Sequence, residues 1–262
     1  MTSGLELRSA RSLGLGERAE LFNAAYEGYF VPFHVDDRQV AAMAEAFDLD
    51  VDASRIAIRD GEPVGLGNLG LRGEDAWIGG VGVVPAARRS GIGETLMRAL
   101  HDQARERGVR RVWLEVIVEN TGAFALYEKL GYRTVRELEV WSLPADEGAE
   151  SAGRESPAAE AHARIRGLRQ AREPWQRADG TLAHYADARG LVTDAGAAVF
   201  RPGSAVQLVQ LAGEAGPLLT SLRRQGTVSV LNLPADDPAA AALTELGGTV
   251  AIRQHEMLLE LA

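Results

Sequence analysis

The stretch VGVVPAARRSGIGETLM, from Val81 to Met97, decides how this chain folds. It predicts a strand, a short basic turn and a helix whose apolar residues recur at Ile92, Leu96 and Leu100. The first turn of a helix has backbone N–H groups without internal partners and the positive end of the helix dipole. Glycines there let a ligand approach, and the two neighbouring arginines add positive charge. The stretch therefore predicts a site for a phosphate or pyrophosphate group.

A second motif shows which kind of phosphate-binding turn this is. The turn lacks the Gly-Lys-Ser/Thr ending of a nucleotide-hydrolase loop and reads Arg-x-x-Gly-x-Gly over residues 88–93. After a predicted strand at 111–118 comes NTGAFALYEKLGY, with Asn120 as a helix N-cap and Gly131 as the residue that ends the helix. Both motifs closely resemble those of the GCN5-related N-acetyltransferases, the GNAT family. The resemblance covers roughly residues 5–143.

The order of predicted elements agrees with this resemblance. Strand-like and helix-like segments follow one another as β-α-α-β-β-β-α-β-α-β. The first six lie at residues 5–8, 17–29, 37–47, 54–59, 62–71 and 76–84. The implied class is α/β (α+β), a GNAT fold with a central, mixed, mostly antiparallel sheet and flanking helices.

One motif is misleading. The run from Gly65 to Gly70 matches the dinucleotide-binding pattern Gly-x-Gly-x-x-Gly. That pattern has to open a helix and needs an acidic residue about 20 positions later. Here residues 71–76 are typical of a turn between two strands, and Ser90 stands at the required distance. The sequence therefore argues against a Rossmann site.

The chain divides by composition into two predicted domains. Residues 1–144 form the acetyl-CoA-binding catalytic domain, 145–161 are rich in Glu, Ala, Ser and Gly and predict a linker, and 162–262 form a smaller α/β domain. When Gly247 is set on Gly131, Leu243 falls on Tyr127, but no Arg-x-x-Gly-x-Gly precedes the helix at 214–224. We expect a tandem protein whose second, GNAT-like domain is degenerate. An unrelated α/β accessory domain is the alternative.

The resemblance implies acetyl-CoA as the cofactor. Backbone N–H groups of residues 89–93 would hold the pyrophosphate, Arg88 would add charge, and the N–H of Val83 would polarise the thioester carbonyl. Asn120 would contact the pantetheine arm, act as a helix cap, or do both. The implied cofactor-binding residues are Val81, Val83, Arg88, Arg89, Ser90, Gly91, Ile92, Gly93, Glu94, Thr95, Asn120, Ala123 and Tyr127.

The catalytic groups follow from the same resemblance. Tyr127 would be the general acid that protonates the leaving thiolate, and its alternative is a core aromatic on an amphipathic helix. Glu115 could take the amine proton through water, although it could equally be an exposed strand glutamate without a catalytic role. His34 is an alternative candidate for the base. Phe30, Phe33 and His34 would shape the acceptor pocket, because the first helix pair covers the substrate side in the family.

Composition limits the remaining possibilities. The chain has no cysteine, so disulfides and thiolate metal sites are excluded, and no metal is expected. We find no signal peptide and no apolar run of about 18 residues, so the cytoplasm is the expected location and no membrane partner is expected. A net charge of −9 argues against nucleic-acid binding and suits a cationic acceptor. A monomer or a homodimer is expected.

These expectations point to an acetyl-CoA-dependent N-acetyltransferase that acts on a primary amine of a small molecule or peptide. A non-catalytic acyl-CoA-binding or sensor module is the alternative. The same scaffold could also carry an O-acyltransferase or a transferase of longer acyl groups.

Overall fold

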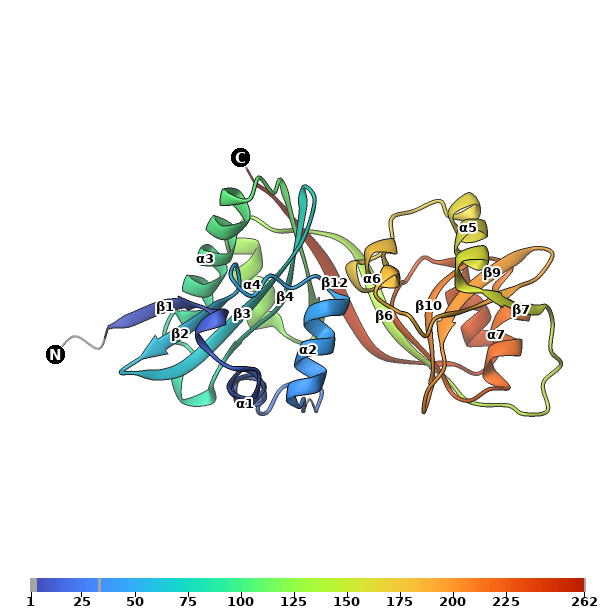
Figure 1. The fold of residues 1–262 in the computed structure, drawn as a ribbon, viewed down its shortest axis with the longest axis horizontal. Coiled ribbons are helices and arrows are strands. Elements are labelled where there is room, and N and C mark those ends of the chain that lie inside the picture. Colours follow the sequence, from blue (N-terminus) through green and yellow to red (C-terminus); the bar gives the residue numbers. More distant parts are fainter. Residues whose placement is uncertain (1–3, 33, 262) are drawn as a thin grey trace. The chain divides into compact units, whose positions relative to one another are not determined.

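A computed structural model describes residues 4–32 and 34–261 (Figure 1). The chain forms two compact units, Met1–Val135 with Glu256–Ala262, and Arg136–His255. The division differs from the expected boundary at 144 and 145. It falls inside two strands, β6 (Arg133–Leu143) and β12 (Thr249–Glu260), each of which begins in one unit and ends in the other. The alternation of residues along a continuous strand does not change at the point where one unit ends and the other begins, so no sequence pattern marks this boundary.

The first unit has the predicted order of elements, and its sheet runs β1-β2-β3-β4-β5-β12. Its first four strands pair antiparallel and β4 pairs parallel with β5, which confirms the mixed, mostly antiparallel sheet. The elements are β1 (Leu5–Ser9), α1 (Leu15–Ala25), α2 (Asp37–Ala46), β2 (Arg55–Arg59), β3 (Glu62–Arg72), β4 (Asp75–Val83), α3 (Ile92–Glu106), β5 (Arg111–Ile117) and α4 (Thr121–Lys129).

Local sequence explains where these elements begin and end. Asp36 caps α2 in a capping box with Gln39. Asp60 and Gly61 both have positive φ, 54° and 87°, as a two-residue hairpin turn between β2 and β3 requires. Gly131, with φ 96°, follows α4, where a left-handed residue stops a helix.

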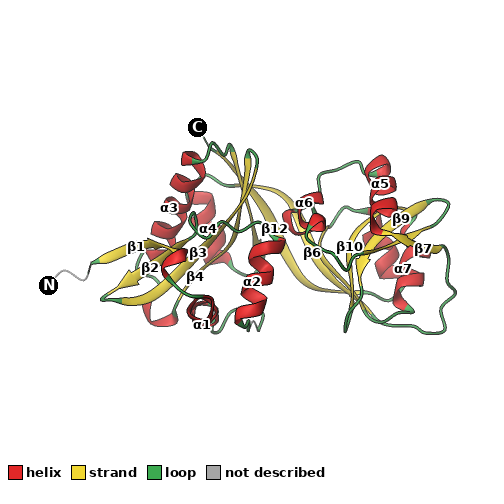
Figure 2. Ribbon diagram, viewed as in Figure 1, coloured by secondary structure: helices red, strands yellow, loops and turns green. Residues whose placement is uncertain are grey.

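The sheet of the first unit is covered on both faces (Figure 2). Ile56, Ile58 and Leu66 pack with residues of α1 and α2, whereas Ala57 packs with residues of α3. A Cβ atom at Gly67 would lie 2.8 Å from Leu100 Cδ1. The glycines that imitate a dinucleotide motif therefore lie within strand β3, and Gly67 lets α3 approach the sheet closely.

The second unit has the sheet order β6-β11-β10-β9-β8-β7. Besides β6 and β12, its elements are β7 (Arg154–Pro157), α5 (Ala158–Leu168), a 3-10 turn (Trp175–Arg177), α6 (Asp179–Ala183), β8 (Arg189–Val192), β9 (Gly196–Arg201), β10 (Val206–Gly213), α7 (Ala215–Arg223), β11 (Val228–Pro234) and α8 (Pro238–Glu245).

The expected linker at 145–161 is only partly irregular in the structure. Its second half contains β7, which pairs antiparallel with β8, and the start of α5. Ala161 is fully buried with Ile165 and Val199. A four-residue polar edge strand has no apolar alternation to reveal it, which explains why the sequence predicted a linker here.

The end of β12 belongs to the core of the first unit. Met257 is fully buried in a cluster with Leu69, Leu114 and Tyr132. We therefore predict that Met257→Ala lowers the free energy of unfolding by about 2–5 kcal/mol, because it leaves a cavity in that core. Urea unfolding measures the change. The half-exposed Leu259 nearby is the control, and an equal loss for Leu259→Ala would contradict a special burial of Met257.

His101 makes the stability of the first unit depend on pH. Its ring is buried, with Nε2 2.9 Å from the Tyr132 hydroxyl, and burial lowers its pKa to about 4. The unfolded chain binds a proton near pH 6.5 and the folded chain does not, so stability is full above pH 6.5 and falls as pH drops towards 4.

We predict a loss of up to about 3 kcal/mol across this window, at about 1.4 kcal/mol per pKa unit. His101→Gln should remove that part of the slope, measured by urea unfolding at several pH values. Replacing the exposed His34 by Gln should leave the slope unchanged. A slope that is the same with and without His101 would refute its role.

Candidate active site

Strands β4 and β5 separate after a short paired segment. They pair in parallel only at Asp75–Trp77 with Arg111–Trp113. Beyond these residues no pairing between the two strands is found in the described chain. We call the space between Ile78–Val83 and Leu114–Ile117 the β4–β5 opening. It leaves one backbone edge of β4 available for a ligand.

The basic turn begins at one end of this opening. Arg89 and Gly91 have positive φ, 59° and 83°, and Gly91 is the N-cap of α3. Within residues 4–32 and 34–261, the backbone N–H groups of residues 89–94 have no hydrogen-bond acceptor. A Cβ at Gly91 would meet no atom within 4 Å. Successive free N–H groups at a helix N-terminus form a cradle for an anion such as pyrophosphate.

The arginines of the turn differ from expectation. Arg88 donates to the backbone carbonyl oxygens of Val83 at 3.0 Å, Ala25 at 3.1 Å and Glu27 at 2.7 Å. Its guanidinium thus joins the end of β4 to the C-terminal end of α1, whose last carbonyls lack helical partners. Arg89 is also exposed, and within the described residues its guanidinium makes no hydrogen bond or ion pair. The half-buried Arg59 of β2 is a further cation at the turn, and it donates to Ser90 Oγ at 3.1 Å.

The other predicted cofactor residues surround the turn. Val81, Val83 and Ile92 pack in one cluster, so these side chains face α3. Glu94 is held by Lys129 at 2.6 Å and Arg98 at 2.8 Å. These hydrogen bonds, that of Lys129 first, lower the pKa of Glu94. Its negative charge is therefore balanced next to the anion cradle.

The last three predicted positions lie on the two helices beside the turn. Thr95 Oγ1 donates to the Gly91 carbonyl at 3.1 Å and secures the N-terminus of α3. A Cβ at Gly93 would meet only Leu126 of α4, at 3.9 Å. Ala123 is half-buried against the core under α4. Small residues thus keep the space between α3 and α4 clear near the turn.

Three tyrosines lie near strand β4, beside the β4–β5 opening. Tyr127 comes from α4, and Tyr26 and Tyr29 come from the end of α1. Burial raises the pKa of each, and smaller electrostatic effects couple Tyr127 to Tyr26 and Tyr29. Helix α4 and α1 pack on opposite faces of the sheet, so these side chains reach this part of β4 from opposite faces.

Tyr26 lies directly on the backbone of β4. A Cβ at Gly80 would lie 2.4 Å from the Tyr26 hydroxyl, and Gly80 has φ 133°, a conformation that favours glycine. Tyr26 and Tyr29 were not predicted as site residues. Their spacing of three places them on one side of a helical turn, and this was the only signal in the sequence.

Asn120 has two partners. Its Oδ1 accepts from the Ala123 N–H at 3.2 Å, which confirms the helix N-cap. Its side chain is also hydrogen-bonded to Tyr29, and this bond acts to lower the pKa of that tyrosine. Asn120 therefore connects α4 with the end of α1.

Glu115 lies on the α2 side of the opening. One carboxylate oxygen accepts from the indole N–H of Trp77 at 2.8 Å. Trp77 in turn packs edge-on against Phe47 at the end of α2, with ring centroids 5.4 Å apart. The side chain of Glu115 is half-buried and held in place, which the sequence did not show. Trp77 is a partner that sequence reasoning missed.

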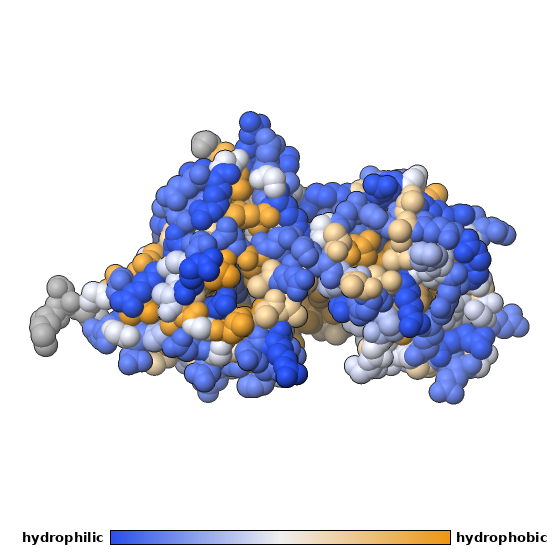
Figure 3. All heavy atoms as spheres, viewed as in Figure 1, coloured by the Kyte–Doolittle hydropathy of each residue, from blue (hydrophilic) through white to orange (hydrophobic). Residues whose placement is uncertain are grey.

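The loop between α1 and α2 forms a hollow beside the tyrosines. Tyr26, Tyr29, Val31, Pro32 and His34 line it. Phe30 is 54% exposed and packs edge-on against Tyr29, with centroids 5.4 Å apart. Phe33, predicted for the same pocket, lies outside the described residues. The surface in Figure 3 is mostly hydrophilic with scattered apolar areas, so an exposed phenylalanine beside a hollow is notable.

The second unit repeats the strand geometry without the site. Strands β10 and β11 also pair in parallel over only three residues each, 206–208 with 228–230. Here, however, the 3-10 turn Trp175–Arg177 lies against the two strands: Gln210 of β10 donates to the Arg177 carbonyl at 2.6 Å, and the turn contacts β11. Arg177 and Leu243 are both fully buried side chains. Leu243, the predicted counterpart of Tyr127, is a core residue.

Among the helices of the described residues, none is long and apolar enough to cross a membrane. No group of His, Asp and Glu side chains in residues 4–32 and 34–261 is arranged to hold a metal ion.

Comparison with known proteins gives the family. A profile described as "Acetyltransferase (GNAT) family" matches residues 18–132. The [ribosomal protein bS18]-alanine N-acetyltransferase of Escherichia coli (strain K12) is 41% identical over 59 residues, which are 22% of this chain and 40% of that protein. The uncharacterized N-acetyltransferase YjcF of Bacillus subtilis (strain 168) is 30% identical over 106 residues, 40% of this chain and 74% of that protein. The chain thus spans less than half the length of the first of these relatives.

The fold of both units has a counterpart. A tandem GNAT protein from the clavulanic acid biosynthesis pathway superposes with a TM-score of 0.68 at 17% identity, covering 98% of each chain. At this identity the likeness concerns the fold alone, and it confirms the tandem arrangement. The motifs, the β4–β5 opening and these comparisons agree, and the chain belongs to the acetyltransferase family known as GNAT.

Proposed function

We propose that the first unit is an acetyl-CoA-dependent N-acetyltransferase acting on a primary amine of a small molecule or a peptide. One observation carries this proposal. The unpartnered backbone N–H groups of residues 89–94 lie at one end of the β4–β5 opening, where Tyr26 also rests on Gly80 of β4. Bound acetyl-CoA supplies an activated thioester whose carbonyl carbon an amine can attack.

The chain's own groups fit such a cofactor. The cradle of N–H groups suits a diphosphate, and Arg89 and Arg59 add the positive charge that Arg88 does not. Val84 donates its N–H to Val64 of β3, and successive N–H groups of a strand point to opposite sides. The N–H of Val83 is therefore directed away from β3, towards the opening, where it can polarise a carbonyl oxygen.

Tyr127 supports the departure of the thiolate. Its raised pKa keeps the hydroxyl protonated throughout the neutral range, so it is a hydrogen-bond donor and not a base. A thiolate of ordinary pKa near 8.5 is a weaker base than such a phenolate. We therefore propose that Tyr127 donates a hydrogen bond to the sulfur as negative charge develops there and keeps its proton, and that the released thiolate takes its proton from water.

Glu115 is proposed as the group that accepts the amine proton, directly or through water. A carboxylate of ordinary pKa near 4.3 cannot deprotonate a free ammonium ion at equilibrium. It can accept the proton once the new C–N bond makes the nitrogen acidic. Its hydrogen bond to Trp77 fixes its position on the α2 side of the opening.

The acceptor class rests on relatives and on charge. The E. coli relative is named for an alanine of a ribosomal protein, that is, for a peptide amine. A net charge of −9 favours a cationic acceptor. The direct experiment incubates the full chain with acetyl-CoA and a panel of amines and peptides and detects free thiol. We expect thiol release that depends on the amine. Binding without release from any amine would favour the sensor alternative.

The cofactor site is tested by Gly91→Glu. The substitution places a carboxylate and a strained left-handed backbone at the anion cradle, so the affinity for acetyl-CoA should fall at least about tenfold, or 1.4 kcal/mol. Titration calorimetry measures it and should also give one acetyl-CoA per wild-type chain, because the second unit fills its own opening.

Gly108 offers a matched control, since it has φ 73° at the other end of α3 and also has no atom near a Cβ. Gly108→Glu brings the same charge and similar backbone strain to α3, and it should bind acetyl-CoA as the wild type does. Unchanged affinity in Gly91→Glu, or two equivalents per chain, would refute this assignment.

The role of Tyr127 is tested by Tyr127→Phe. We predict a kcat lower by about 10²–10⁴-fold, with acetyl-CoA affinity near that of the wild type, because the hydroxyl acts mainly in the transition state. Since the pKa of Tyr127 is raised, the wild-type rate should show no loss from its ionisation up to about pH 9. Tyr185→Phe in the second unit is the control, and full turnover by Tyr127→Phe would reduce Tyr127 to a packing residue.

A further inference from the structure

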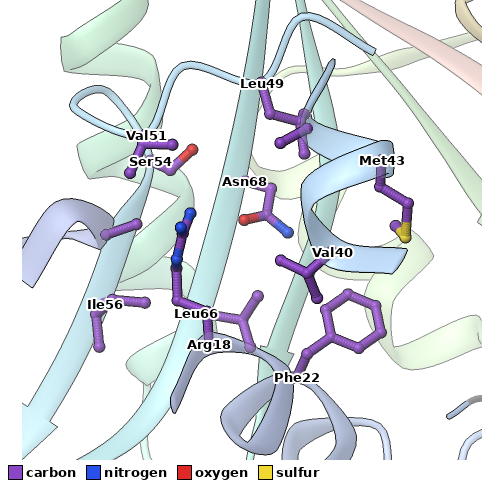
Figure 4. A pocket seen from close by; sticks show the side chains of 12 residues that line it. Arg18, Phe22, Val40, Met43, Leu49, Val51, Ser54, Ile56, Leu66 and Asn68 are labelled. Atoms are coloured by element: carbon purple, nitrogen blue, oxygen red, sulfur yellow. The ribbon is translucent and has the colours of Figure 1, made fainter. Parts of the chain in front are cut away.

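A cavity separate from the β4–β5 opening lies between α1, α2 and the strands β2 and β3 of the first unit (Figure 4). We call it the Arg18 pocket. Phe22, Val40, Met43 and Leu49 form its apolar side. Its polar members are Arg18, Ser54 and Asn68. A cavity with apolar walls and a few convergent polar groups is the usual form of a small-molecule site.

Arg18 is a cation without an anion. Figure 4 shows its nitrogen atoms inside the pocket, near Ser54 and Asn68. Its Nε is shielded from solvent and has no hydrogen-bond acceptor within residues 4–32 and 34–261. The charged group that affects it is Arg11, which is itself paired with Asp52. Burial first, and Arg11 second, lower the pKa of Arg18, yet a guanidinium stays charged. Arg18 is half-buried and only its Nε is shielded, but a shielded N–H of a cation without an acceptor is costly, so this site favours an anion.

Asn68 supplies a second available donor. It lies at the irregularity between Gly67 and Leu69 in the pairing of β3 with β4, and its half-buried amide makes no hydrogen bond in the described chain. Ser54 is different, because its hydroxyl donates to the Asp50 carbonyl at 2.7 Å and accepts from the Leu69 N–H at 3.0 Å. Two donors, one charged and one neutral, match the two oxygens of a carboxylate.

The space limits the size of the ligand. The cavity volume is about 30 Å³. A water needs about 10–15 Å³ on this scale, so the cavity has room for about two or three water-sized groups: a carboxyl group fits and a nucleotide does not. The aliphatic and aromatic walls favour an apolar chain. The ligand chemistry is therefore a small carboxylate with a short apolar body.

We propose that the Arg18 pocket binds such a carboxylate through Arg18 and Asn68. The site lies beside the proposed acetyl-transfer site and does not depend on it. Phe22 of this pocket stacks on Tyr26, with centroids 4.4 Å apart and planes at 14°. Tyr26 in turn lies on Gly80 of β4. A ligand in the pocket would therefore contact Phe22, whose ring stacks on Tyr26 next to the β4–β5 opening.

The test observes Arg18 itself. The ¹⁵N–¹H resonance of its Nε group is assigned by its loss in Arg18→Met, and wild-type protein is titrated with sodium propionate. We expect a saturable shift with propionate. Neutral propionamide and sodium chloride at equal ionic strength should cause none. No saturable shift would mean that the cavity holds only water, and an equal response to chloride would mean a general ionic effect. Either result overturns the proposal.

Variants make the assignment independent of one substitution. In Arg18→Met, propionate should no longer raise the melting temperature, and in Asn68→Ala the propionate affinity should fall several-fold while the Arg18 resonance remains. Arg38→Met, an exposed arginine on α2, is the control and should bind propionate as the wild type does. Equal propionate affinity in Arg18→Met and wild type would overturn the proposal even if the first variant is less stable.

The source of the carboxylate is a separate question that the same probe answers. If it is the acid group of the amine acceptor, propionate raises the KM for that acceptor without changing kcat. If it is a free ligand, propionate leaves that KM unchanged while it still shifts Arg18 Nε. Both results keep the site. Failure of all acetyl transfer would refute the proposed function but not the binding seen at Arg18.

Discussion

The loss of hydrogen bonding between β4 and β5 is the constraint on which the rest of the first unit depends. Parallel pairing stops after Trp77 and Trp113, so a row of β4 backbone groups is left without a strand partner. Buried backbone groups need partners, and a ligand arm lying along β4 can supply them. Tyr127 and Tyr26 come from opposite faces of the sheet and both pack near this part of β4. The proposed cofactor, acid and acceptor would therefore share one sheet.

The two sides of this opening are tied together by a few polar contacts. Arg88 bonds the end of β4 to the carbonyl groups at the end of α1, and Asn120 bonds the start of α4 to Tyr29. Glycine at positions 80 and 82 allows the end of α1 to rest on β4, because a Cβ there would collide with Tyr26 or Ala25. Arg88 of the basic turn thus positions the end of α1, which is a structural use of a residue that the motif associates with phosphate.

The second unit shows how the same strand separation can lose its function. Its β10 and β11 also part after three residue pairs, but Gln210 binds the chain's own backbone at Arg177. A buried ion pair of Arg177 with Glu173, at 2.9 Å, holds that segment in place. The unit therefore satisfies internally the backbone and side-chain groups that a ligand would otherwise satisfy. It still contributes strand β12, whose final residues complete the core of the first unit at Met257.

The sequence by itself determined the family, the order of elements in the first unit, and the turn at residues 88–93. These depend on local patterns: glycine where φ is positive, apolar residues at helical spacing, and N-caps such as Asp36 and Asn120. Tertiary structure alone decided the direction of Arg88, the packing of Tyr26 and Tyr127 near the same part of β4, the bond from Trp77 to Glu115 and the unit boundary inside β6. Each of these joins residues far apart in the chain, and no local periodicity records such contacts. For the same reason, the sequence does not reveal the pocket at Arg18. In the sequence Arg18 is an ordinary helix arginine, and only the packing of α2, β2 and β3 places it in a cavity.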